Sequence, residues 1–264
     1  MTTGTRHLPE RDSRVHVEAP YKLKGPSYPV NRQLLLAIAC LCTILFVGAL
    51  SIAVSGQYAG NDAALGDAVR AAVNQYGLAQ SVAFMSRVSD HPERPVLLLT
   101  GLLAFVFVRL HRYWSAALIL CGIAGGSLLE LTIRSAVDRP PPHIYGEHSF
   151  PSGHAMLAVS FFGVLAFLSW HLTQRRGVAL LTGLTVVLLS TLVGIERLAG
   201  HHLGVHYPSD VLGGYALGGM WLMITLTIFA RRLQEERCER QSGWEPSRLP
   251  RDGIDDSQND GFRC

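Results

Sequence analysis

Residues 34–54 form a long apolar run built almost entirely from Leu, Ile, Ala, Val, Phe and Cys. Its length of about 20 residues is what a helix needs to cross a bilayer. Further apolar runs follow at residues 96–110, 114–133, 155–172, 178–195 and 211–230. Charged residues make up only 16% of the chain and apolar residues 48%, so these runs dominate the composition. We therefore expect an all-α fold in which six transmembrane helices form a bundle.

The polar segments around these runs predict the domain organisation. Residues 1–32 contain prolines among charged residues and no helical period, which is typical of a disordered tail. Residues 57–95 are amphipathic, with apolar residues at helical spacing, and predict short interfacial helices between the first and second spans. The expected division is a cytoplasmic tail over 1–32, a membrane domain over 33–232 and a second, mostly disordered tail over 233–264. The run at 96–110 is short for a span and would have to recruit flanking residues.

The placement of lysine and arginine predicts the orientation. Under the six-span arrangement, 17 of the 23 basic residues lie on the side of the two termini and six lie on the other side. Because cytoplasmic segments carry the excess of Lys and Arg, both termini should be cytoplasmic in an inner membrane, with loops 134–153 and 196–209 on the outer face. The net charge of +3 is small and dispersed, so nucleic acid is not an expected partner.

The first outer loop ends in Pro151-Ser152-Gly153-His154, directly before an apolar run. If that run is a helix, Ser152 and Gly153 lie at its N-terminus, where free backbone N–H groups and the positive end of the dipole favour an anion. Ser152 adds a hydroxyl donor, Gly153 allows close approach of the backbone, and His154 can exchange a proton near neutral pH. The stretch predicts a phosphate site beside an acid–base histidine, although an ordinary helix start uses the same residue types.

The second outer loop ends in His206-Tyr-Pro-Ser-Asp210 before another apolar run. Asp210 should lie in the first helical turn and accept a hydrogen bond from Nδ1 of His206, which leaves Nε2 free as a nucleophile. One histidine that attacks, another that protonates the leaving group and cationic groups that bind the anion can transfer a phosphoryl group without a metal. The alternative reading is a helix-capping Asp near an interfacial His.

Other ionisable residues of the two loops have simpler alternatives. Arg134, Arg139 and Arg197 are candidates for phosphate binding, or they extend from helix ends to the interface. Four more histidines lack the spacing of a zinc site and are interpreted as solvated loop residues: His143, His148, His201 and His202. No metal and no cofactor is expected.

Together these residues resemble the type-2 phosphatidic acid phosphatases, which share an active site with vanadium haloperoxidases and bacterial acid phosphatases. The resemblance covers roughly residues 130–214. It rests on Pro-Ser-Gly-His at 151–154 and on Gly-Val-His-Tyr-Pro-Ser-Asp-Val-Leu-Gly-Gly at 204–214. The six-span layout is similar to that of the integral-membrane branch of the family.

The resemblance implies a role for each motif residue. Ser152 and Gly153 would bind the phosphate, and His154 would be the acid. His206 would become phosphorylated, with Asp210 as its partner.

The basic residues depart from the family pattern. Arg134 stands where the family has Lys, and Arg139 matches an earlier Arg, whereas Pro141 and Gly200 occupy positions where the family has Arg. Arg197 lies further upstream of the second histidine than the family's Arg does.

The expected protein is a membrane phosphatase that hydrolyses a lipid phosphate or diphosphate at the outer face through a phosphohistidine. Phosphatidic acid, phosphatidylglycerol phosphate and undecaprenyl diphosphate all remain open as substrates. The altered arginine positions leave a non-catalytic lipid-binding or transport protein as the alternative, and a metal-dependent hydrolase as a third reading. Beyond substrate and membrane lipids, no obligate protein partner is evident.

Overall fold

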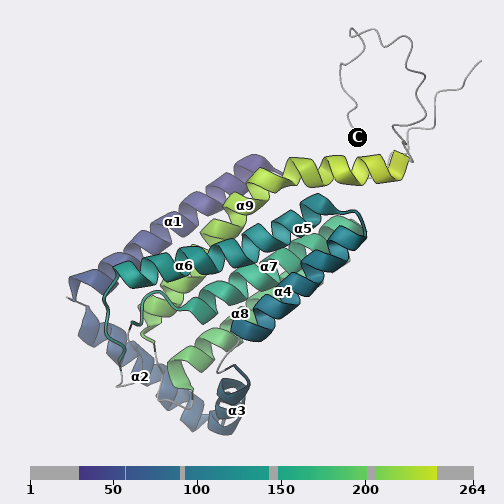
Figure 1. Cartoon of the computed structure of the whole chain (residues 1–264). Helices are drawn as coiled ribbons and strands as arrows, with labels where there is room; N and C mark the ends of the chain where they lie inside the picture. The colour runs from purple at the N-terminus through teal and green to yellow at the C-terminus, as the bar shows by residue number, and fades with distance from the viewer. Residues whose placement is uncertain (1–29, 57, 90–92, 143–147, 201–205, 243–264) are drawn as a thin grey trace, which may run out of the picture.

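The computed structural model describes residues 30–56, 58–89, 93–142, 148–200 and 206–242, and all the regular structure in them is helical (Figure 1). The predicted tails therefore lie largely outside the described residues, although the last helix continues to Ser242. The elements are α1 Arg32–Ser55, α2 Ala59–Gln75, α3 Ala79–Ser89, α4 Glu93–Arg109, α5 Tyr113–Ile119, η1 Leu120–Ala124, α6 Gly125–Ala136, α7 Gly153–Thr173, α8 Arg176–Ala199 and α9 Pro208–Ser242.

Five helices in the described part of the chain are long and apolar enough to cross a membrane. They are α1, the continuous helix Tyr113–Ala136 formed by α5, η1 and α6, and then α7, α8 and α9. The helix α4 packs beside α5, but its apolar stretch Pro95–Arg109 is shorter than a full span. The all-helical fold is thus confirmed, and the count of six spans is not.

The outer faces of these helices carry large apolar side chains. Ile44 of α1 and Leu181 and Val187 of α8 are each at least 65% exposed. Water would make such surfaces unfavourable, whereas the hydrocarbon of a bilayer accommodates them at no cost. With five apolar helices of spanning length, the chain is a multi-pass membrane protein.

The centre of the bundle lies around α7, which packs between α8 and α9, while α1 lies along α9. Leu118 and Ile123 from the helix Tyr113–Ala136, Val164 from α7 and Leu226 from α9 are buried together there. This core holds the helices in a fixed register. It thereby fixes the position of the first turns of α7 and α9, which carry the two sequence motifs.

Small residues let these helices approach closely. A Cβ at Gly122 would lie 2.8 Å from a methyl group of Val164. A Cβ at Gly218 would lie 2.7 Å from the carbonyl oxygen of Met156. These two glycines therefore serve packing within the chain.

Replacing Gly214 with alanine should destabilise the protein. The new Cβ would overlap the carbonyl oxygen of Ser152 and lie 2.9 Å from Cβ of Ala155, so α9 would have to move away from the first turn of α7. We expect a loss of about 1–3 kcal/mol, measured as a lower Tm in detergent. Gly183→Ala on α8 is the matched control, because a Cβ there meets nothing within 4 Å. Equal Tm values for the two variants would contradict this packing.

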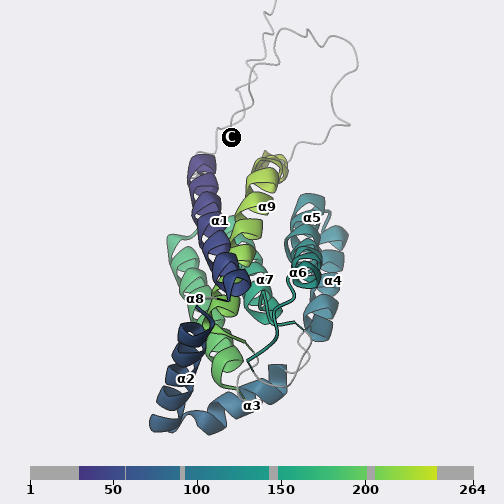
Figure 2. The same cartoon turned by 90° about the vertical axis from the view of Figure 1, so that its left-hand side faces the viewer.

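The helices α2 and α3 lie at one end of the bundle, opposite the C-terminal end of α9 (Figures 1 and 2). Their existence confirms the short helices predicted between the first and second apolar runs. The first turn of α9 lies at this same end, because the backbone N–H of Ser209 donates to Asp62 of α2. The candidate site is built here.

Candidate active site

The two sequence motifs meet through a backbone hydrogen bond. The N–H of Ser152 donates to the carbonyl oxygen of Asp210 at 3.0 Å. As predicted, α7 begins at Gly153 with Ser152 as its N-cap, and Asp210 lies in the first turn of α9. The bond occupies an N–H that we expected to be free for an anion. The next N–H groups of α7 have no acceptor within the helix and point out of its N-terminus.

His206 is buried and is oriented by a backbone carbonyl. Its Nδ1 lies 2.8 Å from the carbonyl oxygen of Ser149 and 3.8 Å from Oδ2 of Asp210. The hydrogen bond that the sequence assigned to Asp210 is therefore made to Ser149 instead. A carbonyl oxygen can only accept, so Nδ1 carries the proton and Nε2 of the neutral ring carries a lone pair. The contact with Ser149 thus favours the tautomer of His206 that the sequence predicted, through a different hydrogen-bond partner.

Asp210 stabilises the turn that holds His206. Its Oδ2 accepts the backbone N–H of Tyr207 at 2.8 Å, and its Oδ1 lies 2.5 Å from Nη1 of Arg139. The carboxylate is fully buried, and its charge is balanced by the guanidinium. Asp210 therefore supports His206 indirectly: it caps the backbone of the turn that follows the histidine, and its carboxylate lies near the ring. The direct hydrogen bond from the ring goes to Ser149.

His154 lies next to Arg197, the arginine whose sequence distance from His206 departs from the family pattern. Nη1 of Arg197 is 3.4 Å from Nδ1 of His154. Arginine can only donate, so this contact requires an unprotonated Nδ1 and puts the proton of the neutral ring on Nε2. Arg197 is buried at the end of α8 and is held by Glu196, whose carboxylate oxygens lie 2.5 Å from Nε and Nη2.

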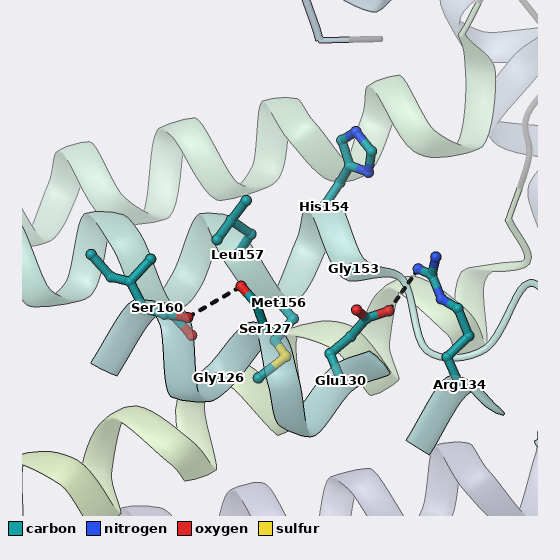
Figure 3. Close-up of a pocket in the computed structure, with 10 residues that line it drawn as sticks. Gly126, Ser127, Glu130, Arg134, Gly153, His154, Met156, Leu157 and Ser160 are labelled. Atoms are coloured by element: carbon teal, nitrogen blue, oxygen red, sulfur yellow. Dashed lines mark hydrogen bonds and ion pairs between the residues drawn. The ribbon is translucent and has the colours of Figure 1, made fainter. Parts of the chain in front are cut away.

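Glu130 and Arg134 face one another beside Gly153 (Figure 3). Nη2 of Arg134 lies 2.7 Å from Oε1 of Glu130 and 3.3 Å from the carbonyl oxygen of Pro151. A Cβ at position 153 would lie 3.0 Å from both groups of this pair, which explains the glycine. The pair and His154 border a cavity of about 300 Å³ that extends along α7 past Leu157.

Two donors near the start of α7 have no hydrogen-bond partner among the described residues. They are the hydroxyl of Ser152 and Nε of Arg134. Buried donors are normally satisfied, so groups of this kind at a functional site are the ones that a ligand would engage. Both are donors, which fits an oxyanion better than a cation.

Residues 96–234 match the PAP2 superfamily. This match covers more than half of the chain and includes both motifs. The chain belongs to the PAP2 superfamily. Its fold is similar to the crystal structure of a transmembrane PAP2-type phosphatidylglycerolphosphate phosphatase from Bacillus subtilis. That similarity has a TM-score of 0.57 at 23% identity and covers 76% of this chain and 96% of the other.

Several curated PAP2 relatives are similar in sequence. Phosphatidylglycerophosphatase B of Bacillus subtilis (strain 168) is 32% identical over 134 residues, or 47% of this chain and 61% of the relative. Lipid A 1-phosphatase of Rhizobium etli is 29% identical over 133 residues, 45% of this chain and 52% of the relative. The putative undecaprenyl-diphosphatase YbjG of Escherichia coli (strain K12) is 31% identical over 102 residues, 39% of this chain and 45% of the relative. The matched regions thus span about half the length of these relatives.

Arg139 of this PAP2 protein is bound to protein carboxylates. Its Nη2 lies 2.8 Å from Asp62, its Nη1 contacts Asp210 and Ser209, and the ring of Tyr207 stacks at 4.1 Å. With 6% of the side chain exposed, the guanidinium is enclosed by these partners. From the sequence we expected Arg139 to bind phosphate. In the structure its guanidinium instead contacts side chains of the protein itself.

The site of this PAP2 protein contains carboxylates that sequence reasoning did not select. Asp62 lies in an amphipathic segment whose pattern gave no hint of burial. Glu130 had a visible signal, because a charge inside an apolar run is uncommon and usually functional. Glu196 was assigned with Arg197 to an outer loop, but both lie in the last turn of α8, which ends at Ala199.

The histidines considered for a zinc site are mostly outside the described residues. This applies to His143, His201 and His202. His148 is described, and its Nδ1 lies 3.3 Å from Oδ1 of Asp138, an exposed carboxylate. Within the described ranges, no group of three or more His, Cys, Asp or Glu side chains is placed to hold a metal ion.

Proposed function

We propose that this PAP2 protein is a metal-independent phosphatase that hydrolyses a lipid phosphate or diphosphate through a phosphohistidine on His206. The observation that carries the proposal is the orientation of His206 beside the start of α7. Ser149 leaves a lone pair on Nε2 of His206, and the backbone hydrogen bond from Ser152 to Asp210 holds the two motifs together. One histidine is thus prepared to attack, and a second, His154, lies next to the phosphate donors, as a two-step displacement requires.

The first displacement forms the phosphoenzyme. The lone pair on Nε2 of His206 attacks phosphorus, a P–N bond forms, and the P–O bond to the lipid breaks. His154 acts in its imidazolium form, with Nδ1 protonated and released from Arg197. It gives its Nε2 proton to the departing oxygen and becomes neutral, and the oxygen leaves as an alcohol or as a phosphate monoester. Ser152, Arg134 and Arg197 supply the hydrogen-bond donors and positive charge that stabilise the transferring group.

The second displacement regenerates the enzyme. A water oxygen attacks phosphorus, and its proton passes to Nε2 of His154. The P–N bond breaks, the lone pair returns to His206, and inorganic phosphate leaves. His154 thus acts as the acid in the first step and as the base in the second.

The cavity beside His154 supports a lipid leaving group. Because His154 protonates the departing oxygen, the leaving group lies on its side of the site, where the cavity is lined by Ile123, Met156 and Leu157. A volume of about 300 Å³ is at the small end for ligand pockets, so it suits the head-group end of a lipid whose tails continue into the bilayer. The relatives are named for action on phosphatidylglycerophosphate, lipid A 1-phosphate and undecaprenyl diphosphate.

The site is proposed to lie on the outer face of the cytoplasmic membrane. The start of α1 and the end of α9 lie at one end of the bundle, and α2 with the site lies at the other (Figures 1 and 2). The basic residues are concentrated at the end that carries the termini, which is the cytoplasmic end by the positive-inside rule. The membrane domain is proposed to cover residues 33–232.

Purified protein should release phosphate from at least one of phosphatidic acid, phosphatidylglycerol phosphate and undecaprenyl diphosphate, with full activity in EDTA. His206→Ala should lower kcat by on the order of 10³-fold or more, since the nucleophile is lost. In sealed, right-side-out vesicles, an impermeant aryl phosphate should be hydrolysed without detergent. Lipid binding without phosphate release would favour the non-catalytic alternative, and loss of activity in EDTA would favour a metal-dependent hydrolase.

A further inference from the structure

A buried cluster of charges joins α2 to the start of α9. Asp62 of α2, Arg139 and Asp210 all have side chains that are at most 6% exposed. Asp62 lies outside residues 96–234, the part of the chain that matches the family. The cluster therefore includes a residue that the family match does not cover.

Asp62 contacts both Arg139 and Ser209. Its Oδ2 lies 2.8 Å from Nη2 of Arg139, and its Oδ1 accepts the backbone N–H of Ser209 at 3.0 Å. The hydroxyl of Ser209 donates to Oδ2 of Asp62 and lies 2.7 Å from Nη1 of Arg139. One carboxylate thus fixes the guanidinium and the first turn of α9 at once.

Arg139 in turn holds His206 from two directions. Its backbone carbonyl accepts the N–H of Ser149 at 2.9 Å, and the carbonyl of Ser149 is the acceptor for Nδ1 of His206. Its side chain pairs with Asp210, which caps the turn directly after His206. A shift of Arg139 would therefore move the carbonyl and the turn that orient the ring.

We infer that Asp62 is a positioning residue for the nucleophile, acting through Arg139. The inference rests on the proposed function. The guanidinium of Arg139 forms one ion pair with Asp62 and another with Asp210, and the two pairs together determine its position. Without the charge of Asp62, Arg139 keeps Asp210, Ser209 and the ring of Tyr207, and its side facing α2 loses its ion pair. Misplacement of a reacting group by about 1 Å costs on the order of 100-fold in rate.

The test separates rate from folding by using an aryl phosphate such as p-nitrophenyl phosphate in a His154→Ala background. On the proposed mechanism, each active molecule there releases one nitrophenol and then stops as the phosphoenzyme. The burst amplitude counts folded sites, and the burst rate reports attack by His206. Asp62→Asn should keep the amplitude per molecule and lower the rate by roughly 10- to 100-fold.

Asp67→Asn is the matched control on the same helix. Its side chain is 70% exposed and pairs with Arg70, so the burst rate should stay within about 2-fold of the parent. If Asp62→Asn fails to fold, Ser209→Ala, which removes only the bridging hydroxyl, should lower the burst rate severalfold. If the variant that folds has the burst rate of the His154→Ala parent, the inference about Asp62 is wrong, while the proposed mechanism still stands. Absence of any burst in the His154→Ala parent would instead refute the proposed mechanism, and the inference with it.

Discussion

His154→Ala should accumulate phosphohistidine when the substrate has a good leaving group. An aryl oxygen leaves without help from an acid, so attack by His206 should remain fast. The second step needs a base for the attacking water, and its loss should slow turnover by on the order of 10²- to 10⁴-fold. Rapid-quench labelling should therefore find about one phosphoryl group per enzyme, labile in acid and stable in base.

The control is the double variant His154→Ala/His206→Ala, which should show neither burst nor label. On substrates with alkyl leaving groups, His154→Ala should also be slow in the first step, so no intermediate should build up. Stable label on Ser or Asp would exclude His206 as the nucleophile. A single inversion at a chiral phosphorus would exclude any covalent intermediate.

Arg197→Ala should lower kcat/KM by on the order of 10²- to 10³-fold. The side chain lies 3.4 Å from Nδ1 of His154, so on the proposed mechanism its loss removes a cation next to the transferring group. The effect should appear mainly in kcat, because charge at the transferring phosphoryl group grows toward the transition state. Steady-state kinetics on the preferred lipid and on an aryl phosphate would measure it.

A structural effect of this substitution can be separated from the catalytic one. Removing Arg197 leaves Glu196 buried without its cation, which should by itself destabilise the protein by about 3–5 kcal/mol. The double variant Glu196→Gln/Arg197→Ala removes both charges and keeps an acceptor for the hydroxyl of Ser86. We expect it to recover most of the Tm and none of the rate. A double variant with wild-type kcat/KM would place Arg197 outside the chemistry.

The helical membrane fold and the motif positions were predictable from the sequence. Apolar run length is a local property, and it located the five helices of spanning length in the described part of the chain, because a bilayer permits few alternatives. Helix-start chemistry is local too, so α7 begins at Gly153 and α9 at Pro208 as the residue types indicate. The run at 96–110 was the exception, since α4 has no extra apolar residues with which to reach full span length.

The partners of the buried charges depended on tertiary structure. The sequence predicted a protonated Nδ1 on His206, but the acceptor is the carbonyl of Ser149, a group that every residue has and no pattern marks. Arg139 stands beside a motif and was assigned to phosphate, yet it pairs with Asp62, which lies 77 positions away in the sequence.

The physical reason is the range of the interactions. Periodicity and capping act between residues a few positions apart, so the sequence alone can reveal them. A buried charge pairs with whichever opposite charge the packing brings within about 3 Å, and that choice is made by helices distant in the chain. The sequence therefore determined which residues stand at the helix starts, and the packing of α2 against α9 decided what holds them.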